Sequence, residues 1–127
     1  RRLSMSKNYV DGFVIPIKKK NIKDYKKMAM IGCKSWMKHG ALSYYECVGD
    51  DFVKHGLGFK KMCKLKPDET FVFAFIVFKS KSHRDKVNKK VLAEMESMYQ
   101  GENMKMPFDM KKFAMAGCKT LVQSKNK

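Results

Sequence analysis

The stretch FVFAFIVF, residues 71–78, decides the fold of this chain. It is the longest uninterrupted apolar run among the 127 residues, whereas a helix that crosses a membrane needs ~20 apolar residues. Its aromatic and β-branched residues fall on both faces of an extended chain, which indicates a buried strand. No charged segment followed by an apolar one opens the sequence. We therefore expect no signal peptide, no membrane span and a cytoplasmic location.

Other strands are predicted on both sides of this run. YVDGFVIPI, residues 9–17, carries apolar groups on both faces, and ALSYYECV, residues 41–48, runs into a GDD turn. FKKMCKL, residues 59–65, is predicted as a weaker strand, and KKFAMAGCKTLV, residues 111–122, as the last one.

Two amphipathic helices connect these strands. Asn21 followed by Asp24 marks the start of the first helix, and Ser82 followed by Asp85 marks the start of the second, which runs to about Tyr99. The resulting order is β-α-β-(β)-β-α-β. It predicts a ferredoxin-like α+β fold, a βαββαβ chain forming an antiparallel sheet with two helices on one face.

The apolar pattern of two strands predicts that a partner covers the face of the sheet that the helices leave open. Two helices can cover only one face, yet residues 9–17 and 71–78 are apolar on both. A sheet with one solvated face should instead alternate apolar and polar residues. We therefore expect a homodimer in which the sheets of two copies stack.

The net charge of +16, from 28 Lys and Arg against 12 Asp and Glu, raises the question of nucleic acid. Lysines are spread along the chain, over both predicted helices and most of the turns, and arginine, the usual reader of bases and phosphates, is nearly absent. A generally cationic surface is favoured. RNA or polyanion binding is kept as the alternative function, and its signature would be an affinity that falls steeply with salt.

Cysteine and histidine spacing predicts no metal site and no cofactor. The four cysteines occur singly, without a C-x-x-C pair, and the three histidines are far apart. The cysteines are interpreted as reduced thiols, mostly buried. RRLS, residues 1–4, precedes Met5 and is interpreted as a non-native remnant, which leaves a single domain at residues 5–127.

Arg84 is the arginine that the helical periodicity places inside the fold. It lies in the middle, and Asn88 at the border, of an inward stripe formed by Val87, Val91, Met95 and Met98. A partly buried guanidinium needs a carboxylate or an anionic ligand. One interpretation is a structural ion pair to Asp50, Asp51 or Asp109. The other is that Arg84 and Asn88 line a ligand pocket between sheet and helix, and the two are compatible.

Glu46 shares a strand face with Tyr44 and Val48. Under the helices it would be a general-base candidate, and on the outer face a partner for lysines. Asp109 is the other weak acid–base candidate, so whether the protein is an enzyme is left open. Cys47 is interpreted as a buried thiol, and His83 as exposed. The residues predicted to bind a ligand are Arg84, Asn88, Glu46, Asp50, Asp51, His83 and Trp36, the last as core or as an aromatic wall.

Four stretches together carry a family resemblance: YVDGFVIPI, HGALSYYECVGDD, FVFAFIVFKSKSHRDKVNKKV and MPFD. They resemble the YbaA-like family of small bacterial proteins, a domain of unknown function numbered 1428, from Tyr9 to Val122. The resemblance implies a dimeric α/β barrel of ferredoxin-like subunits. That superfamily includes cofactor-independent monooxygenases, dye- and haem-handling enzymes and sensing modules, so the fold does not fix a chemistry. Residues typical of the family match Glu46, Asp50, Asp51, His83, Arg84, Asp85, Asn88 and Asp109.

These observations lead to one expected function. The protein is expected to be a small cytoplasmic homodimer that binds a small polar or aromatic molecule between its sheet and helices. Whether it also transforms that molecule is left open. The expected ligand is a small molecule rather than a membrane or a nucleic acid.

Overall fold

The structure, a computed structural model, describes residues 7–100, 102 and 105–125. The predicted remnant at residues 1–4 and Met5 lie outside the described residues.

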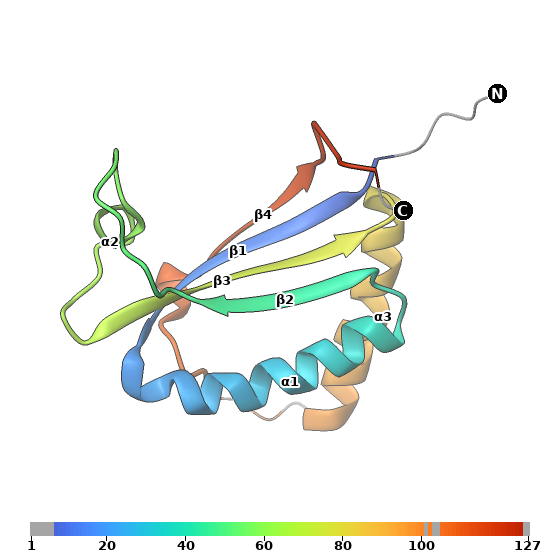
Figure 1. Cartoon of the computed structure of the whole chain (residues 1–127). Coiled ribbons are helices and arrows are strands. Elements are labelled where there is room, and N and C mark those ends of the chain that lie inside the picture. The colour runs from blue at the N-terminus through green and yellow to red at the C-terminus, as the bar shows by residue number, and fades with distance from the viewer. Residues whose placement is uncertain (1–6, 101, 103–104, 126–127) are drawn as a thin grey trace.

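Four antiparallel strands form one sheet in the order β2-β3-β1-β4 (Figure 1). The central strands are β1 (Tyr9–Lys18) and β3 (Glu69–Phe78), which pair along their full length. The edge strands are β2 (Ser43–Val48) and β4 (Ala114–Lys119). The apolar run at residues 71–78 is therefore part of an inner strand, as its β-branched and aromatic residues predicted.

Two long helices lie on the same face of the sheet (Figure 1). They are α1 (Ile22–Lys38) and α3 (Lys81–Tyr99). The 3₁₀ turn η1 (Lys19–Asn21) directly precedes α1, and η2 (Met110–Lys112) precedes β4. The predicted antiparallel α+β arrangement, with two helices on one face, is confirmed.

The weaker strand predicted at residues 59–65 is wrong. This segment contains the short helix α2 (Phe59–Met62) at one end of the sheet. Phe59 and Met62 are three residues apart, the spacing of one helical turn, and the two lysines between them break the alternation that a strand needs. The last strand is also shorter than predicted, because η2 occupies residues 110–112 and β4 begins at Ala114.

The predicted helix starts are partly corrected. Asn21 is the N-cap residue of α1, but its side chain makes no capping hydrogen bond and donates instead to the carbonyl of Pro107 at 3.1 Å. In α3 the cap is Ser80, not Ser82: Ser80 Oγ accepts from the backbone N–H of His83 at 3.1 Å. Ser80 has the extended backbone of a cap residue, which places the first helical residue at Lys81.

The core lies between the sheet and the two helices, in two adjoining clusters. One contains Ile15, Ile17, Tyr25, Ala29, Val72 and Ala74, and the other Ala41, Ile76, Phe78, Val87 and Val91. The predicted inward stripe of α3 holds for Val87 and Val91 but ends before Met98, which is 52 % exposed.

Glu94 links the two helices. Its carboxylate accepts from Ser35 Oγ at 2.6 Å, from Lys38 Nζ at 2.6 Å and contacts His39 Nε2 at 3.1 Å. The hydrogen bonds from Lys38 and Ser35 lower the pKa of Glu94 to about 2. A polar contact of this kind fixes where α3 crosses α1.

Arg84 is held by a buried aspartate. Its Nη1 donates to Asp11 Oδ1 at 2.7 Å, and its Nε donates to the exposed Asp85 at 2.8 Å. The guanidinium carbon lies 5.0 Å from the centre of the Tyr9 ring. Asp11 is only 1 % exposed and is the third residue of β1. Burial raises the pKa of Asp11, and the neighbouring guanidinium opposes that shift.

The ion-pair interpretation of Arg84 is therefore confirmed, but the three partners that we predicted are wrong. Asp50, Asp51 and Asp109 are exposed and make no ion pair with Arg84 in the described part of the chain. Asp11 stands inside an otherwise apolar strand. Its alternation with Phe13 and Ile15 is the signal that places it under α3.

The substitution Arg84→Ala should lower the free energy of unfolding by about 3 kcal/mol, because it leaves the buried Asp11 carboxylate without its cation. Urea unfolding followed by circular dichroism measures this loss. Lys89→Ala, an exposed position on the same helix, is the matched control and should change stability by less than ~0.5 kcal/mol. Equal losses in both variants would contradict the assignment.

Candidate functional site

A cavity of about 350 Å³, partly open to solvent, lies between the sheet and the helices. Its volume is within the range of small-ligand pockets. Small residues leave this space: Ala74 on β3 and Gly32 on α1 both line it. A side chain at Gly32 would meet the Tyr44 hydroxyl at 3.0 Å, so the glycine is needed where the helix passes that tyrosine.

Glu46 places its carboxylate in this cavity. It pairs with Ala74 across β2 and β3, on the face that the helices cover. Tyr25 donates its hydroxyl to Glu46 Oε1 at 2.7 Å, and Tyr44 donates to Oε2 at 2.6 Å. The inner-face alternative for Glu46 is therefore the correct one, and no lysine pairs with it among the described residues.

The two tyrosines stay protonated. Burial raises the pKa of both Tyr25 and Tyr44 well above the usual value of 10, and the Glu46 carboxylate raises it further. Each hydroxyl is therefore a fixed donor, which allows Glu46 to remain an acceptor in apolar surroundings. Sequence analysis missed their role, although Tyr44 shares a strand face with Glu46 and Tyr25 lies on the inward face of α1.

Trp36 lines the cavity and also packs against the core cluster that contains Phe78 and Val87. Its Nε1 donates to Asn88 Oδ1 at 2.9 Å, and its ring centre lies 6.0 Å from that of Tyr44. Asn88 does not line the cavity itself and acts on it through the orientation of Trp36.

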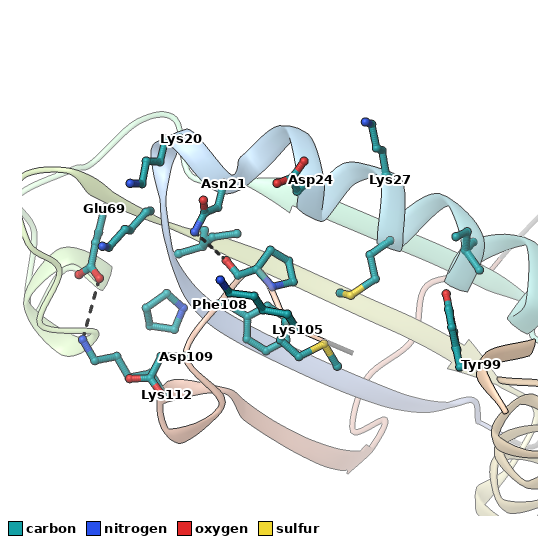
Figure 2. A pocket seen from close by; sticks show the side chains of 17 residues that line it. Lys20, Asn21, Asp24, Lys27, Glu69, Tyr99, Lys105, Phe108, Asp109 and Lys112 are labelled. Atoms are coloured by element: carbon teal, nitrogen blue, oxygen red, sulfur yellow. Dashed lines mark hydrogen bonds and ion pairs between the residues drawn. The ribbon is translucent and has the colours of Figure 1, made fainter. Parts of the chain in front are cut away.

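An outer groove of about 700 Å³, whose lining residues Figure 2 shows, adjoins the cavity. The two hollows have lining residues in common: Met28, Ile31, Tyr99, Met106 and Phe108. Figure 2 shows Lys20 and Lys27 on one side of the groove and Lys105 and Lys112 on the other. The groove thus combines an apolar wall, shared with the cavity, and a basic rim.

The other predicted site residues do not meet in the cavity. Arg84 is outside it, and Asp50 and Asp51 line separate hollows near α2. Asp109 is at the outer groove, where its carboxylate accepts from the backbone N–H of Lys111 at 2.9 Å. Of the seven residues predicted to bind a ligand, Glu46 and Trp36 line the cavity.

Two predictions about exposure are wrong. His83 is half-buried: its Nδ1 accepts from the backbone N–H of Lys79 at 2.9 Å, and burial together with nearby lysines lowers its pKa. Cys47 is exposed in the single chain, because it points to the face of the sheet that the helices leave open. Cys118, on β4, is exposed on the same face.

Comparison with known proteins identifies relatives of this chain. The family model described as "Protein of unknown function (DUF1428)" matches residues 8–110. The uncharacterized protein YbaA of Escherichia coli K12 is 32% identical over 116 residues, which cover 90% of this chain and 97% of YbaA. YbaA of Shigella flexneri matches to the same extent.

Solved structures share the fold at low identity. A dimeric ferredoxin-like protein from an uncultured marine organism has a TM-score of 0.53 at 12% identity, over 93% of this chain and 99% of that one. A protein of unknown function from Nitrosomonas europaea has a TM-score of 0.53 at 9% identity, over 98% and 99% of the two chains. The fold is therefore ferredoxin-like α+β. In the described residues, no helix has the length and apolar character that a membrane span requires.

Alkaline titration should distinguish Tyr25 and Tyr44 from the other tyrosines of the chain. Tyr25 and Tyr44 should not ionise near pH 10, because burial and the Glu46 carboxylate raise their pKa values. Absorbance of tyrosinate measures this, and the double variant Tyr25→Phe/Tyr44→Phe should lose only the late part of the titration. Loss of signal near pH 10 in that variant would show that the two hydroxyls are not held by Glu46.

Proposed function

The chain belongs to the DUF1428 family, and from its cavity we propose that it is a cytosolic homodimer in which each subunit binds one small aromatic molecule that donates a hydrogen bond to Glu46. The observation that carries this proposal is the Glu46 carboxylate, which two tyrosines hold inside an otherwise apolar cavity. The four cysteines are free thiols, which supports a reducing compartment.

Glu46 retains capacity to accept a further hydrogen bond. A carboxylate has about four acceptor positions, and Tyr25 and Tyr44 use one on each oxygen. Glu46 is the only charged residue among the described residues that line the cavity. A ligand hydroxyl or N–H would therefore find one charged acceptor in the cavity. A hydrogen bond to a charged acceptor contributes more binding free energy than one between two neutral groups.

The walls favour a flat molecule. Phe13, Trp36, Phe108 and Phe113 line the cavity, and the rings of Phe108 and Phe113 are stacked with centres 5.7 Å apart. Aromatic walls bind flat rings through both burial and ring contacts. The proposal is one of binding; if the bound molecule reacts, Glu46 is placed to act as the base, and Asp109, at the outer groove, is not.

The uncovered face of the sheet supports a homodimer with stacked sheets, the dimeric α/β barrel. Val10, Val14, Phe75 and Val77 on the inner strands point to this face, together with the exposed Tyr45 and Phe73. Tyr45 is 55% exposed and Phe73 41%. Solvated apolar side chains in a continuous patch mark an association surface. The marine ferredoxin-like protein of similar fold is described as dimeric.

RNA or polyanion binding stays the alternative. Its support is the net charge of +16, which gives any polyanion a long-range attraction. The lysines are spread over the helices α1, α2 and α3 and over the loops rather than gathered in one segment, which favours the cavity as the specific site.

Binding can be tested with N-phenyl-2-naphthylamine, a flat aromatic probe with a single N–H. The protein has one tryptophan, Trp36, in the cavity wall, so the probe should quench tryptophan fluorescence on binding. Glu46→Gln should lower the affinity for the probe about tenfold, because the charged acceptor is lost. Glu96→Gln, an exposed glutamate on α3, should bind as the wild type does. Equal affinity of both variants, or no quenching, would refute the site.

Light scattering after size-exclusion chromatography should give the mass of two chains for the wild type. Phe73→Glu puts a charge in the centre of the proposed interface and should shift the mass to that of one chain. Met30→Glu, at a 63% exposed position of α1, is the control and should remain a dimer. A wild-type protein with the mass of one chain at micromolar concentration would exclude the dimer.

A further inference from the structure

We propose that the molecule bound in the cavity is an amphipathic anion whose acidic group lies among the lysines of the outer groove. This inference rests on the proposed function and adds the chemical class of the ligand. It is carried by two observations: the cavity and the groove share a wall, and the positive charge along the groove is not neutralised by the protein.

Because the cavity and the groove share a wall, one ligand can place its apolar part in the cavity and its charged group in the groove. Met28, Tyr99 and Phe108 contact both hollows. A ring system that fills the cavity therefore ends at residues that also form the groove (Figure 2). A substituent on that end would leave the apolar surroundings and enter the groove.

Four of the five groove lysines lack a partner in the described part of the chain. Lys112 lies 3.9 Å from Glu69, whereas the others form no ion pair there. These others are Lys18, Lys20, Lys27 and Lys105. Like charges around one groove repel one another, and an anion between them relieves that repulsion.

The carboxylates of the groove are largely occupied. Glu69 accepts from the backbone N–H of Lys66 at 2.8 Å and faces Lys112. Asp109 accepts from the backbone N–H of Lys111. Asp24 alone of the three groove carboxylates makes no such contact in the described structure. With five lysines against three carboxylates along its lining, the groove is left with a net positive charge.

The charges also fix the direction of the ligand. An acidic group beside Glu46 would meet a carboxylate in a cavity where no cation compensates it. The hydrogen-bond donor must therefore point inward and the acidic group outward. Lysines act as point charges without the planar fork of arginine, so carboxylate, sulfonate and phosphate groups all qualify. The class is a flat aromatic hydroxy or amino compound with an acidic group at its opposite end.

A matched pair of probes tests this class. 6-Anilinonaphthalene-2-sulfonate has the ring system and N–H of N-phenyl-2-naphthylamine and adds a sulfonate at the far end. Quenching of Trp36 reports both. The sulfonate should bind about tenfold more tightly than the neutral probe, and this advantage should shrink as salt is added.

Two double variants of equal charge place the anion. Lys27→Gln/Lys105→Gln removes two groove lysines. In this variant the sulfonate should bind no more tightly than the neutral probe, whose own affinity should change by less than twofold. Lys86→Gln/Lys89→Gln makes the same charge change on α3, outside the groove, and should alter neither probe.

The outcomes separate the two proposals. If the neutral probe binds at Glu46 and the sulfonate binds no better, the anion inference is wrong and the proposed function stands. If both double variants weaken the sulfonate equally, the effect is diffuse surface charge and the inference is also wrong. If neither probe quenches Trp36, both proposals fail.

Discussion

The full-length pairing of β1 with β3 constrains the rest of the molecule. Ten residue pairs, from Tyr9↔Phe78 to Lys18↔Glu69, determine which side chains point to the helices and which point away. A slip of one residue would bring Phe73 and Phe75 under the helices in place of small Ala74, and the cavity would be filled. The cavity and the uncovered apolar face are therefore two consequences of one register.

Two carboxylates lie under the helices, and different groups stabilise their negative charges. Asp11 receives a guanidinium, so its charge is neutralised and its role is structural. Glu46 receives two neutral hydroxyls, which stabilise the charge without removing it. A charge kept in this way retains acceptor capacity toward a ligand. This difference, more than burial, separates the structural site from the candidate binding site.

The sequence predicted the fold well because apolar periodicity is a local property. The strand at residues 71–78, the inward face of α1 and the burial of Arg84 all follow from it. The site was predicted only in part, since it depends on which elements become neighbours. Asp50 and Asp51 follow Glu46 closely in sequence but lie elsewhere, whereas Tyr25 meets Glu46 from another element. Spacing along one helix or strand carries no information on such contacts.

The edge strand β2 connects the two proposals. Its alternate residues serve different faces: Tyr44 and Glu46 point into the cavity, and Tyr45 and Cys47 point to the uncovered face. Tyr45 stacks on Phe75 with ring centres 4.9 Å apart, and β2 pairs with β3 alone. A partner sheet on the outer face would therefore hold the strand that carries Glu46. By linkage, any strengthening of ligand binding through dimer formation must strengthen dimer formation through the ligand by the same factor.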